Sequence, residues 1–211
     1  MSKPHLLTKT EIKEKYDGFA RWYDVVEALP EFFGVRALRR GLAGRVHGKT
    51  LEIAAGSGKN FRLLPEDVDL VAGDISRGML QIADHKARKL GMRPKYALLD
   101  AENLPFPDDT FDTVLSTLSS CTFPDPAVAF QEMSRVCKPD GRILLLEHGR
   151  SSNRAIGWYQ DFRAESHASK FGCQWNRAPV EIARNAGLEL VDVRTYFFDV
   201  FAVMEARPAS S

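Results

Sequence analysis

Two glycines and an acid near the start of the chain have the types and spacing needed to bind an adenosine-containing ligand. Gly56 and Gly58 form a turn directly after the apolar run 50–53, and Asp74 ends the next apolar run. Glycines remove side chains where the backbone must pass close to a ligand. A carboxylate at the end of the second strand can accept hydrogen bonds from two ribose hydroxyls. The order of strand, glycine turn, helix, strand and acid therefore predicts an adenosine cofactor.

Glu52 and Phe61 distinguish between the cofactors that such a turn can hold. A dinucleotide fold needs a small residue at the third glycine position, so that the helix packs closely and the pyrophosphate sits on its N-terminus. Phe61 occupies that position, while Glu52 places an acid at the end of the first strand. An acid there can hold an ammonium group. The pair favours S-adenosylmethionine, whose methionine half carries an amine, over a nicotinamide cofactor.

Five motifs in sequence order resemble those of class I S-adenosylmethionine-dependent methyltransferases, with Ala54 where a first glycine is commoner. They are 52–58 for the first motif, 74–80 for ribose binding, 100–106 for the adenine loop, 111–116 for the fourth strand and 136–142 for the turn into the fifth. The resemblance extends from about Tyr16 to the last strand. It implies S-adenosylmethionine as the cofactor, with contacts from Tyr16, Tyr23, Glu52, Ala54, Gly56, Gly58, Asn60, Phe61, Asp74, Ile75, Ser76, Met79, Asp100, Ala101, Glu102, Thr117 and Leu118.

Other segments are similar to one branch of that family. Residues 16–24 resemble the lid ahead of the core in the quinone C-methyltransferases. Segments 58–65, 147–148 and 172–177 resemble bacterial phospholipid N-methyltransferases and thiol methyltransferase-like proteins. The branch implies a small, lipophilic or membrane-derived acceptor: a phospholipid amine, a quinone or a thiol. Tyr16 and Tyr23 are expected to close over the cofactor, the alternative being that these aromatic residues only pack the helix onto the core.

The expected fold is α/β: a doubly wound, mostly parallel seven-stranded sheet of the Rossmann-like methyltransferase type, with a helical N-terminal lid. Strands are predicted at 50–53, 70–74, 95–99, 113–116 and 142–147, with helices between them, and then at 188–196 and 200–206 as a reversed closing hairpin. We expect a single domain. Its parts are a lid segment 1–43, a cofactor-binding core 44–150, an acceptor-side insertion 151–187 and closing strands 188–207.

Composition narrows the class of protein. The 211 residues are 44% hydrophobic, enough for one core, and the net charge of +1 gives no case for nucleic acid. Cys121, Cys137 and Cys173 are odd in number and widely separated, so we expect a reducing cytoplasm and no metal site. The longest apolar run, 143–146, is too short to cross a bilayer, and 1–10 lacks the apolar segment of a signal peptide. The chain is expected to be soluble or to lie on a membrane surface.

Two histidines are the candidate general bases. His148 ends the fifth strand and has an ordinary pKa suited to a general base, with His167 as a second candidate, unless each only makes structural hydrogen bonds. Tyr23 is the alternative, as a group that orients a polar acceptor. Cys121 and Cys173 are not expected to act as nucleophiles, because the methyl group passes directly to the acceptor in this family and neither cysteine has an evident partner base.

Segment 29–40 combines apolar residues at helical spacing with an arginine cluster, Arg36, Arg39 and Arg40. This pattern is typical of a helix that lies on an anionic membrane surface, here with Phe32 as an anchor. The alternative is a core-packing helix with a solvated basic edge. At the level of function, a methyltransferase is the first interpretation; a non-catalytic S-adenosylmethionine-binding protein and a nicotinamide-dependent oxidoreductase are the alternatives.

Overall fold

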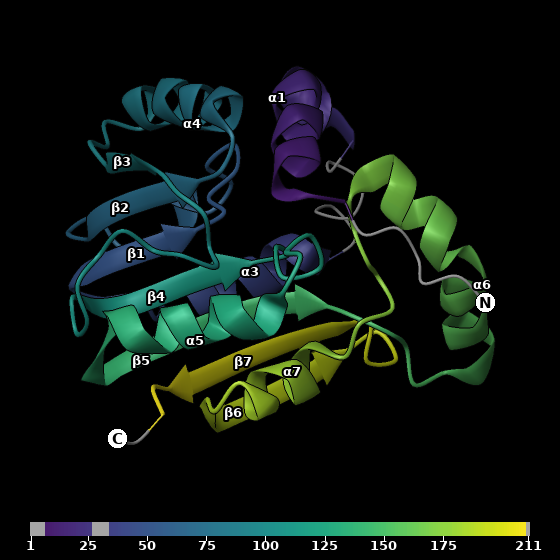
Figure 1. The fold of residues 1–211 in the computed structure, drawn as a ribbon. Helices are drawn as coiled ribbons and strands as arrows, with labels where there is room; N and C mark the ends of the chain where they lie inside the picture. Colours follow the sequence, from purple (N-terminus) through teal and green to yellow (C-terminus); the bar gives the residue numbers. More distant parts are fainter. Residues whose placement is uncertain (1–6, 27–33, 210–211) are drawn as a thin grey trace.

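The computed structural model describes residues 7–26 and 34–209, which form a seven-stranded sheet flanked by helices (Figure 1). The strand order is β3-β2-β1-β4-β5-β7-β6. The strands are β1 (Lys49–Ile53), β2 (Asp69–Asp74), β3 (Lys95–Leu98), β4 (Phe111–Thr117), β5 (Cys137–His148), β6 (Glu189–Tyr196) and β7 (Phe201–Arg207). The pairs among β1 to β5 are parallel, and β7 lies antiparallel between β5 and β6. The predicted fold class and its reversed closing hairpin are confirmed.

Helices cover both faces of the sheet. On one face, α3 (Arg36–Ala43) and α4 (Arg77–Lys89) pack, and on the other α5 (Pro126–Val136) and α7 (Pro179–Asn185). Neighbouring residues of the central strands face opposite layers: Leu115 and Leu144 pack with Leu42 of α3, whereas Val114 and Ile143 pack with Phe130 of α5. This two-sided burial explains why the central strands read as continuous apolar runs.

Two further helices lie at the carboxyl edge of the parallel strands. They are α1 (Lys9–Val26), which packs against α4, and α6 (Arg154–Phe171) (Figure 1). Of the eighteen residues of α6, all described, only Gly157 and Gln160 are buried. None of the helices in the described ranges is long and apolar enough to span a membrane.

The helix expected directly after the glycine turn is absent. Between β1 and β2, where every residue is described, the chain forms only the three-residue 3-10 helix η2 (Phe61–Leu63). Gly56 and Gly58 both have positive φ, and Pro65 follows closely, so a continuous helix cannot begin in the turn or extend past the proline. The connection from β3 to β4 is also free of helix throughout its described residues. The prediction of a helix between every pair of strands was therefore wrong.

Candidate functional site

A cavity of about 740 Å³, including its open mouth, lies between α1 and the carboxyl edge of the sheet. That size is within the usual range for small-molecule sites. Eleven residues that the sequence assigns to the cofactor line it: Tyr16, Ala54, Gly56, Asp74, Ile75, Met79, Asp100, Ala101, Glu102, Thr117 and Leu118. Eight more residues complete the wall: Lys9, Ile12, Ile53, Leu99, Ser119, Thr122, Phe123 and Pro124. The sequence motifs therefore converge on one cavity.

The two glycines of the turn have different roles. Gly56 has a φ of +56° and borders the cavity, and a Cβ built on it meets nothing closer than the Ala54 carbonyl oxygen at 3.9 Å. Gly58 has a φ of +74°, but its Cβ would lie 2.7 Å from the ring of Phe61. Phe61 is buried beneath the turn. Gly56 thus leaves room above the backbone for a ligand, whereas Gly58 leaves room for Phe61.

Ala54 has a φ of +51°, in the left-handed region where glycine is favoured. A non-glycine residue there costs about 1–2 kcal/mol. This conformation gives a physical reason for the glycine that is commoner at this position in the motif that 52–58 resembles. Ala54 nevertheless borders the cavity, with its side chain tolerated at that strained backbone.

Asp74 holds the glycine turn and the start of α4 together. Its Oδ2 accepts a hydrogen bond from the Gly56 N–H, and its Oδ1 accepts one from the Ser76 N–H, both at 2.8 Å. Burial raises the pKa of Asp74 to about 6, against the opposing effect of these two N–H donors. Each carboxylate oxygen can accept a second hydrogen bond. Asp74 is therefore both a structural acceptor and an acceptor available to a ligand in the cavity.

Ser76 caps α4 instead of lining the cavity. Its Oγ accepts a hydrogen bond from the Met79 N–H and donates one to Asp17 of α1. Asp17 also accepts the Gly78 N–H, at the positive end of the α4 dipole. Burial alone would raise the pKa of Asp17, but hydrogen bonds from Ser76, Lys13 and Gly78 lower it to about 2. This pair docks α1 beside the cavity, a role for Asp17 that its sequence position did not suggest.

Lys9 ties the start of α1 to the opposite wall. Its Nζ lies 2.6 Å from Asp100 Oδ2 and 2.7 Å from Glu102 Oε2. The sequence reading missed Lys9 and Ile12, although their spacing with Tyr16 puts all three on one helical face. That periodicity was the signal available to find them.

Glu52 and Asn60 lie behind the turn in a buried polar network. Asn60 Nδ2 donates to Glu52 Oε1 and to Thr117 Oγ1, and Arg39 donates to Thr117 Oγ1 as well. Burial raises the pKa of Glu52 to about 7, and its Oε2 has no hydrogen-bond partner among the described residues. Neither Glu52 nor Asn60 is among the described residues that line the cavity. That Glu52 binds the ammonium group stays a prediction.

Arg39 does not belong to an exposed basic patch. It is buried, whereas Arg36 and Arg40 on the same helix are exposed. The expectation of three arginines on one surface was therefore wrong, because one of them turns inward to the Thr117 hydroxyl. Phe32 lies outside the described residues.

A carboxylate fixes the loop that forms the cavity's far wall. Glu147, fully buried on β5, accepts the N–H groups of Ser119 and Ser120 on its Oε2, both at 3.1 Å. Burial raises the pKa of Glu147 above its usual range. Leu118, just before these serines, has a φ of +55° and lines the cavity. The loop's shape therefore depends on one buried carboxyl group.

The candidate bases lie outside the cavity wall formed by the described residues. His148 Nε2 is 3.2 Å from Cys173 Sγ. His167 Nδ1 contacts the Cys173 carbonyl oxygen, and its ring stacks on Trp175. Tyr23 is in α1, but its side chain lies outside the described part of the structure.

Cys173 has a histidine beside it. The statement that neither cysteine has a partner base was wrong, because His148 contacts Cys173 across 25 residues of sequence. Cys121 is nevertheless a poor nucleophile. Its hydrogen bond with Cys173, followed by burial, raises the pKa of the Cys121 thiol well above its ordinary value.

Comparisons with known proteins find methyltransferases. A family described as a methyltransferase domain matches residues 51–145. A phosphatidylethanolamine N-methyltransferase of Cereibacter sphaeroides is 32% identical, over 60% of this chain and 72% of that protein. The ubiquinone/menaquinone biosynthesis C-methyltransferase UbiE of Idiomarina loihiensis is 30% identical, over 78% of this chain and 69% of that protein. The mitochondrial methyltransferase OMS1 of Saccharomyces cerevisiae is 31% identical over 91% of this chain, which spans 45% of OMS1.

Solved structures share the fold at lower identity. The cyclase SpnF has a TM-score of 0.74 at 19% identity and covers 98% of both chains. A geranyl diphosphate methyltransferase in complex with SAM has a TM-score of 0.66 at 14% identity, over 82% of this chain and 84% of that chain. A fold of this kind thus occurs in proteins named for different chemistry, so the reaction must be argued from the site.

Proposed function

This chain belongs to the family of S-adenosylmethionine-dependent methyltransferases, and on that premise we propose that it methylates a small lipophilic acceptor at the cavity beside α1. The observation that carries the proposal is the convergence of the family's motif residues on that cavity, next to a wall formed by Leu118, Phe123 and Pro124. Apolar side chains there suit an acceptor with a hydrocarbon part. Phospholipid amines, quinones and thiols are the acceptor classes we propose.

The residues present fit the cofactor. Asp74 has acceptor capacity left for ribose hydroxyls, and the space above Gly56 lets the ligand approach the backbone closely. S-adenosylmethionine supplies an electrophilic methyl group on a sulfonium. We infer that Lys9 and Tyr16 of α1 act as a lid that keeps water out and holds the acceptor in line with that methyl group.

The acceptor itself is expected to need little help from a base. Lys9, Tyr16, Asp74, Asp100 and Glu102 are the described titratable side chains on the wall, and Lys9 is paired with two of the acids. A neutral amine or a thiolate, formed when the acceptor loses its proton to solvent, attacks the methyl group without a strong general base. This composition supports an amine or thiol more than an acceptor that must lose a proton from carbon.

A screen for S-adenosylhomocysteine release tests the proposal. We expect turnover with a lipid-dispersed amine, thiol or quinone, and little with a small hydrophilic amine. The variant Phe123→Ala is expected to raise KM for the active acceptor while leaving cofactor affinity unchanged; Val128→Ala, on the exposed side of α5, is the matched control. Cofactor binding without release from any acceptor would favour the non-catalytic binding protein instead.

Cofactor affinity is expected to depend on pH through Asp74. Its pKa is raised to about 6, so it ionises as the pH rises through that value, and the ionised form is the better acceptor for ribose hydroxyls. Affinity for S-adenosylhomocysteine should therefore fall below pH ~6, by up to about tenfold per pH unit. Calorimetry between pH 5 and 8 measures this.

The unliganded protein should show the opposite trend. A raised pKa stabilises the folded state below the unfolded value of about 3.9, and the contribution is lost as the pH rises through 6. Asp74→Asn, which cannot ionise, should flatten both profiles. A wild-type affinity independent of pH in this range would contradict the assignment.

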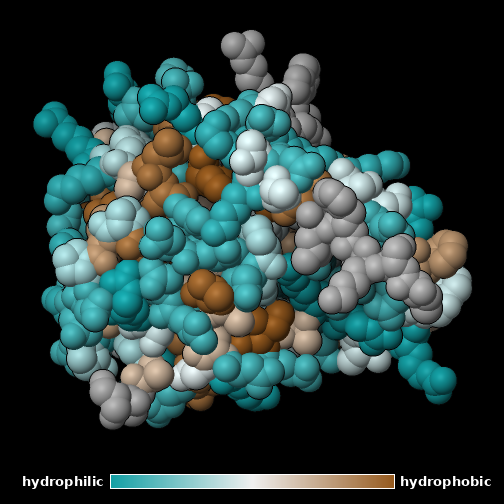
Figure 2. All heavy atoms as spheres, in the orientation of Figure 1, coloured by the Kyte–Doolittle hydropathy of each residue, from teal (hydrophilic) through white to brown (hydrophobic). Residues whose placement is uncertain are grey.

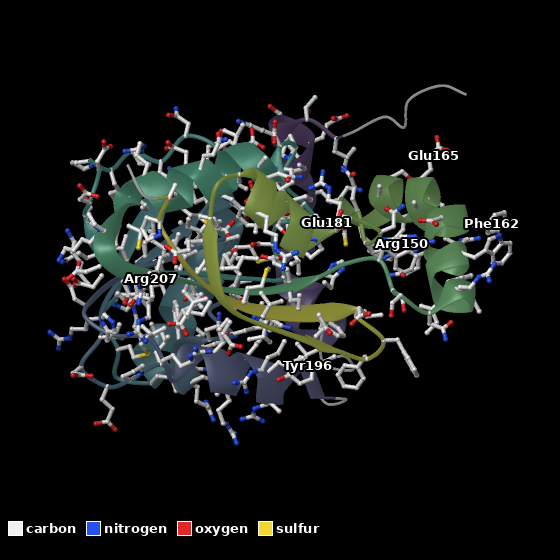
Figure 3. The ribbon with its side chains drawn as sticks, turned by 90° about the horizontal axis from the view of Figure 1, so that it is seen from below. Arg150, Phe162, Glu165, Glu181, Tyr196 and Arg207 are labelled. Carbon is white, nitrogen blue, oxygen red and sulfur yellow. The ribbon has the colours of Figure 1, made fainter. Side chains whose placement is uncertain are left out.

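We propose further that the protein contacts an anionic membrane surface through α6 and the turn between β6 and β7. Trp158 and Phe162 of α6 stack at 5.5 Å while remaining 64% and 69% exposed, and Phe198 in the turn is 66% exposed. Figure 3 shows Phe162 on the outer side of α6. On the side where Figure 1 draws α6, tan and white groups project among hydrophilic ones in Figure 2. The Ser152 N–H donates to the Phe198 carbonyl, so the two elements adjoin.

Basic residues accompany these aromatics. Arg154, Arg163 and Lys170 of α6 are exposed, alongside the exposed Glu165 and an Asp161 that pairs with Arg150, and each cation near an anionic surface contributes about 1 kcal/mol. Aromatic side chains inserted at the boundary add apolar burial. We propose this surface as the membrane-facing one in place of segment 29–40, in which Arg39 is buried.

Liposome sedimentation tests the surface. Trp158→Ser with Phe162→Ser should abolish most binding to anionic vesicles at low salt, and high salt should weaken the wild type because the charges are screened. Leu98→Ser is the matched control, since Leu98 is 50% exposed on β3 at the opposite edge of the sheet. Equal sedimentation of all three proteins would rule this surface out.

A further inference from the structure

A second group of reactive side chains lies behind the far wall of the cavity. Cys121, His148 and Cys173 each offer one ligand atom, and these atoms all lie within 4.8 Å of one another. Cys121 is buried in the loop after β4, His148 ends β5, and Cys173 follows α6. Three distant parts of the sequence thus bring two sulfurs and one imidazole nitrogen together, outside the cofactor cavity.

Backbone hydrogen bonds hold the three parts in place. The Gln174 N–H donates to the Cys121 carbonyl at 2.9 Å, and the Arg150 N–H donates to the Arg177 carbonyl at 2.8 Å. Gly149 allows a close approach, since a Cβ there would lie 2.5 Å from the Arg177 carbonyl oxygen. The ligand-bearing segments are therefore fixed by contacts that do not involve the ligand atoms, which is the support a preorganised site needs.

The separations suit a tetrahedral metal ion. Zinc binds cysteine sulfur at about 2.3 Å and histidine nitrogen at about 2.0–2.1 Å, so tetrahedral ligands lie about 3.4–3.8 Å apart. Cys173 Sγ and His148 Nε2 are already 3.2 Å apart, and no pair exceeds 4.8 Å. Small rotations of the side chains are enough to close the remaining difference.

We propose that Cys121, His148 and Cys173 bind a thiophilic divalent cation, with Zn²⁺ as the best match. Two sulfurs and an imidazole form a soft donor set that suits Zn²⁺ and not Mg²⁺ or Ca²⁺. With three ligands among the described residues, the fourth position is open to water or to a soft group of a small molecule. Two thiolates balance the charge of the ion, so the centre has no net charge.

The ion has a structural consequence. It links the loop after β4, the end of β5 and the segment after α6, so zinc should raise the melting temperature of the protein. His148 then serves as a metal ligand and is not available as a free base. The inference stands apart from the methyl transfer proposed above, because metal binding is measured directly and without an acceptor.

Cobalt titration of the full chain is the test. Protein reduced with a phosphine and freed of metal by a chelator is titrated with Co²⁺, and a thiolate-to-cobalt charge-transfer band should saturate at one equivalent and disappear on adding Zn²⁺. Cys121→Ser, Cys173→Ser and His148→Ala should each weaken binding by more than the ~10- to 100-fold typical of losing an outer-shell partner. Cys137→Ser is the matched control, because Cys137 is buried at the other end of β5.

Circular dichroism and S-adenosylhomocysteine binding show whether each variant is folded. The proposal is overturned if the wild type gives no band, if folded Cys121→Ser and Cys173→Ser variants bind Co²⁺ as tightly as the wild type, or if Cys137→Ser abolishes the band. It is also overturned if thiol counting shows that Cys121 and Cys173 remain joined as a disulfide under these reducing conditions.

Discussion

Asp74→Ala is expected to lower the affinity for S-adenosylhomocysteine by about 10- to 150-fold, equivalent to roughly 1.5–3 kcal/mol for hydrogen bonds to a charged group. The carboxylate borders the cavity and already positions Gly56 and Ser76 through their N–H groups. Its loss removes the ribose acceptors and leaves two N–H groups without their partner. Isothermal calorimetry measures the change.

Asp69→Ala is the matched control for this substitution. Asp69 begins the same strand, and its ion pair with Lys95 is largely exposed, so little should change. If Asp74→Ala folds normally and binds the cofactor product as tightly as the wild type, Asp74 is not part of the binding site.

Glu147→Ala is expected to destabilise the protein by about 2–5 kcal/mol, because it leaves the buried N–H groups of Ser119 and Ser120 without an acceptor. Cofactor affinity should fall as well, since Ser119 lines the cavity. Urea denaturation at constant pH measures the stability, and calorimetry measures the affinity.

Glu147→Gln makes the test specific. One glutamine oxygen can accept both N–H groups, and its amide can donate to the hydroxyls of Ser116 and Ser119, which now contact the other carboxylate oxygen. We expect this variant to keep most of the stability. Glu189→Ala, at an exposed position in β6, is the surface control. A loss in Glu147→Gln as large as in Glu147→Ala would show that the charge itself, and not the acceptor geometry, maintains the loop.

The strands were predictable because buried parallel strands require continuous apolar runs, as at 50–53 and 142–147. The error after β1 has an equally local cause. Gly58 was interpreted as the entry to a helix, whereas its positive φ and Phe61 beneath it leave room for only one 3-10 turn. A glycine pattern specifies a tight turn but not the length of the helix that follows it.

The site was predictable where its residues follow strand ends and not where it depends on contacts between distant elements. Asp74 and Asp100 line the cavity as expected, but Ser76 turns toward α4 and α1. Arg39 looked like a surface charge because its buried acceptor, Thr117, lies 78 residues further along the chain. The cluster of Cys121, His148 and Cys173 was invisible for the same reason: sequence spacing shows metal ligands only when they share a local motif.

The loop held by Glu147 lies between two sites. Ser119 and Thr122 face the cofactor cavity, while Cys121, between them in sequence, contributes to the cysteine–histidine group. A ligand that moves this loop on binding at one site changes the affinity of the other site for its own ligand. Thermodynamic reciprocity then requires that the ligands of the two sites alter each other's dissociation constants by the same factor.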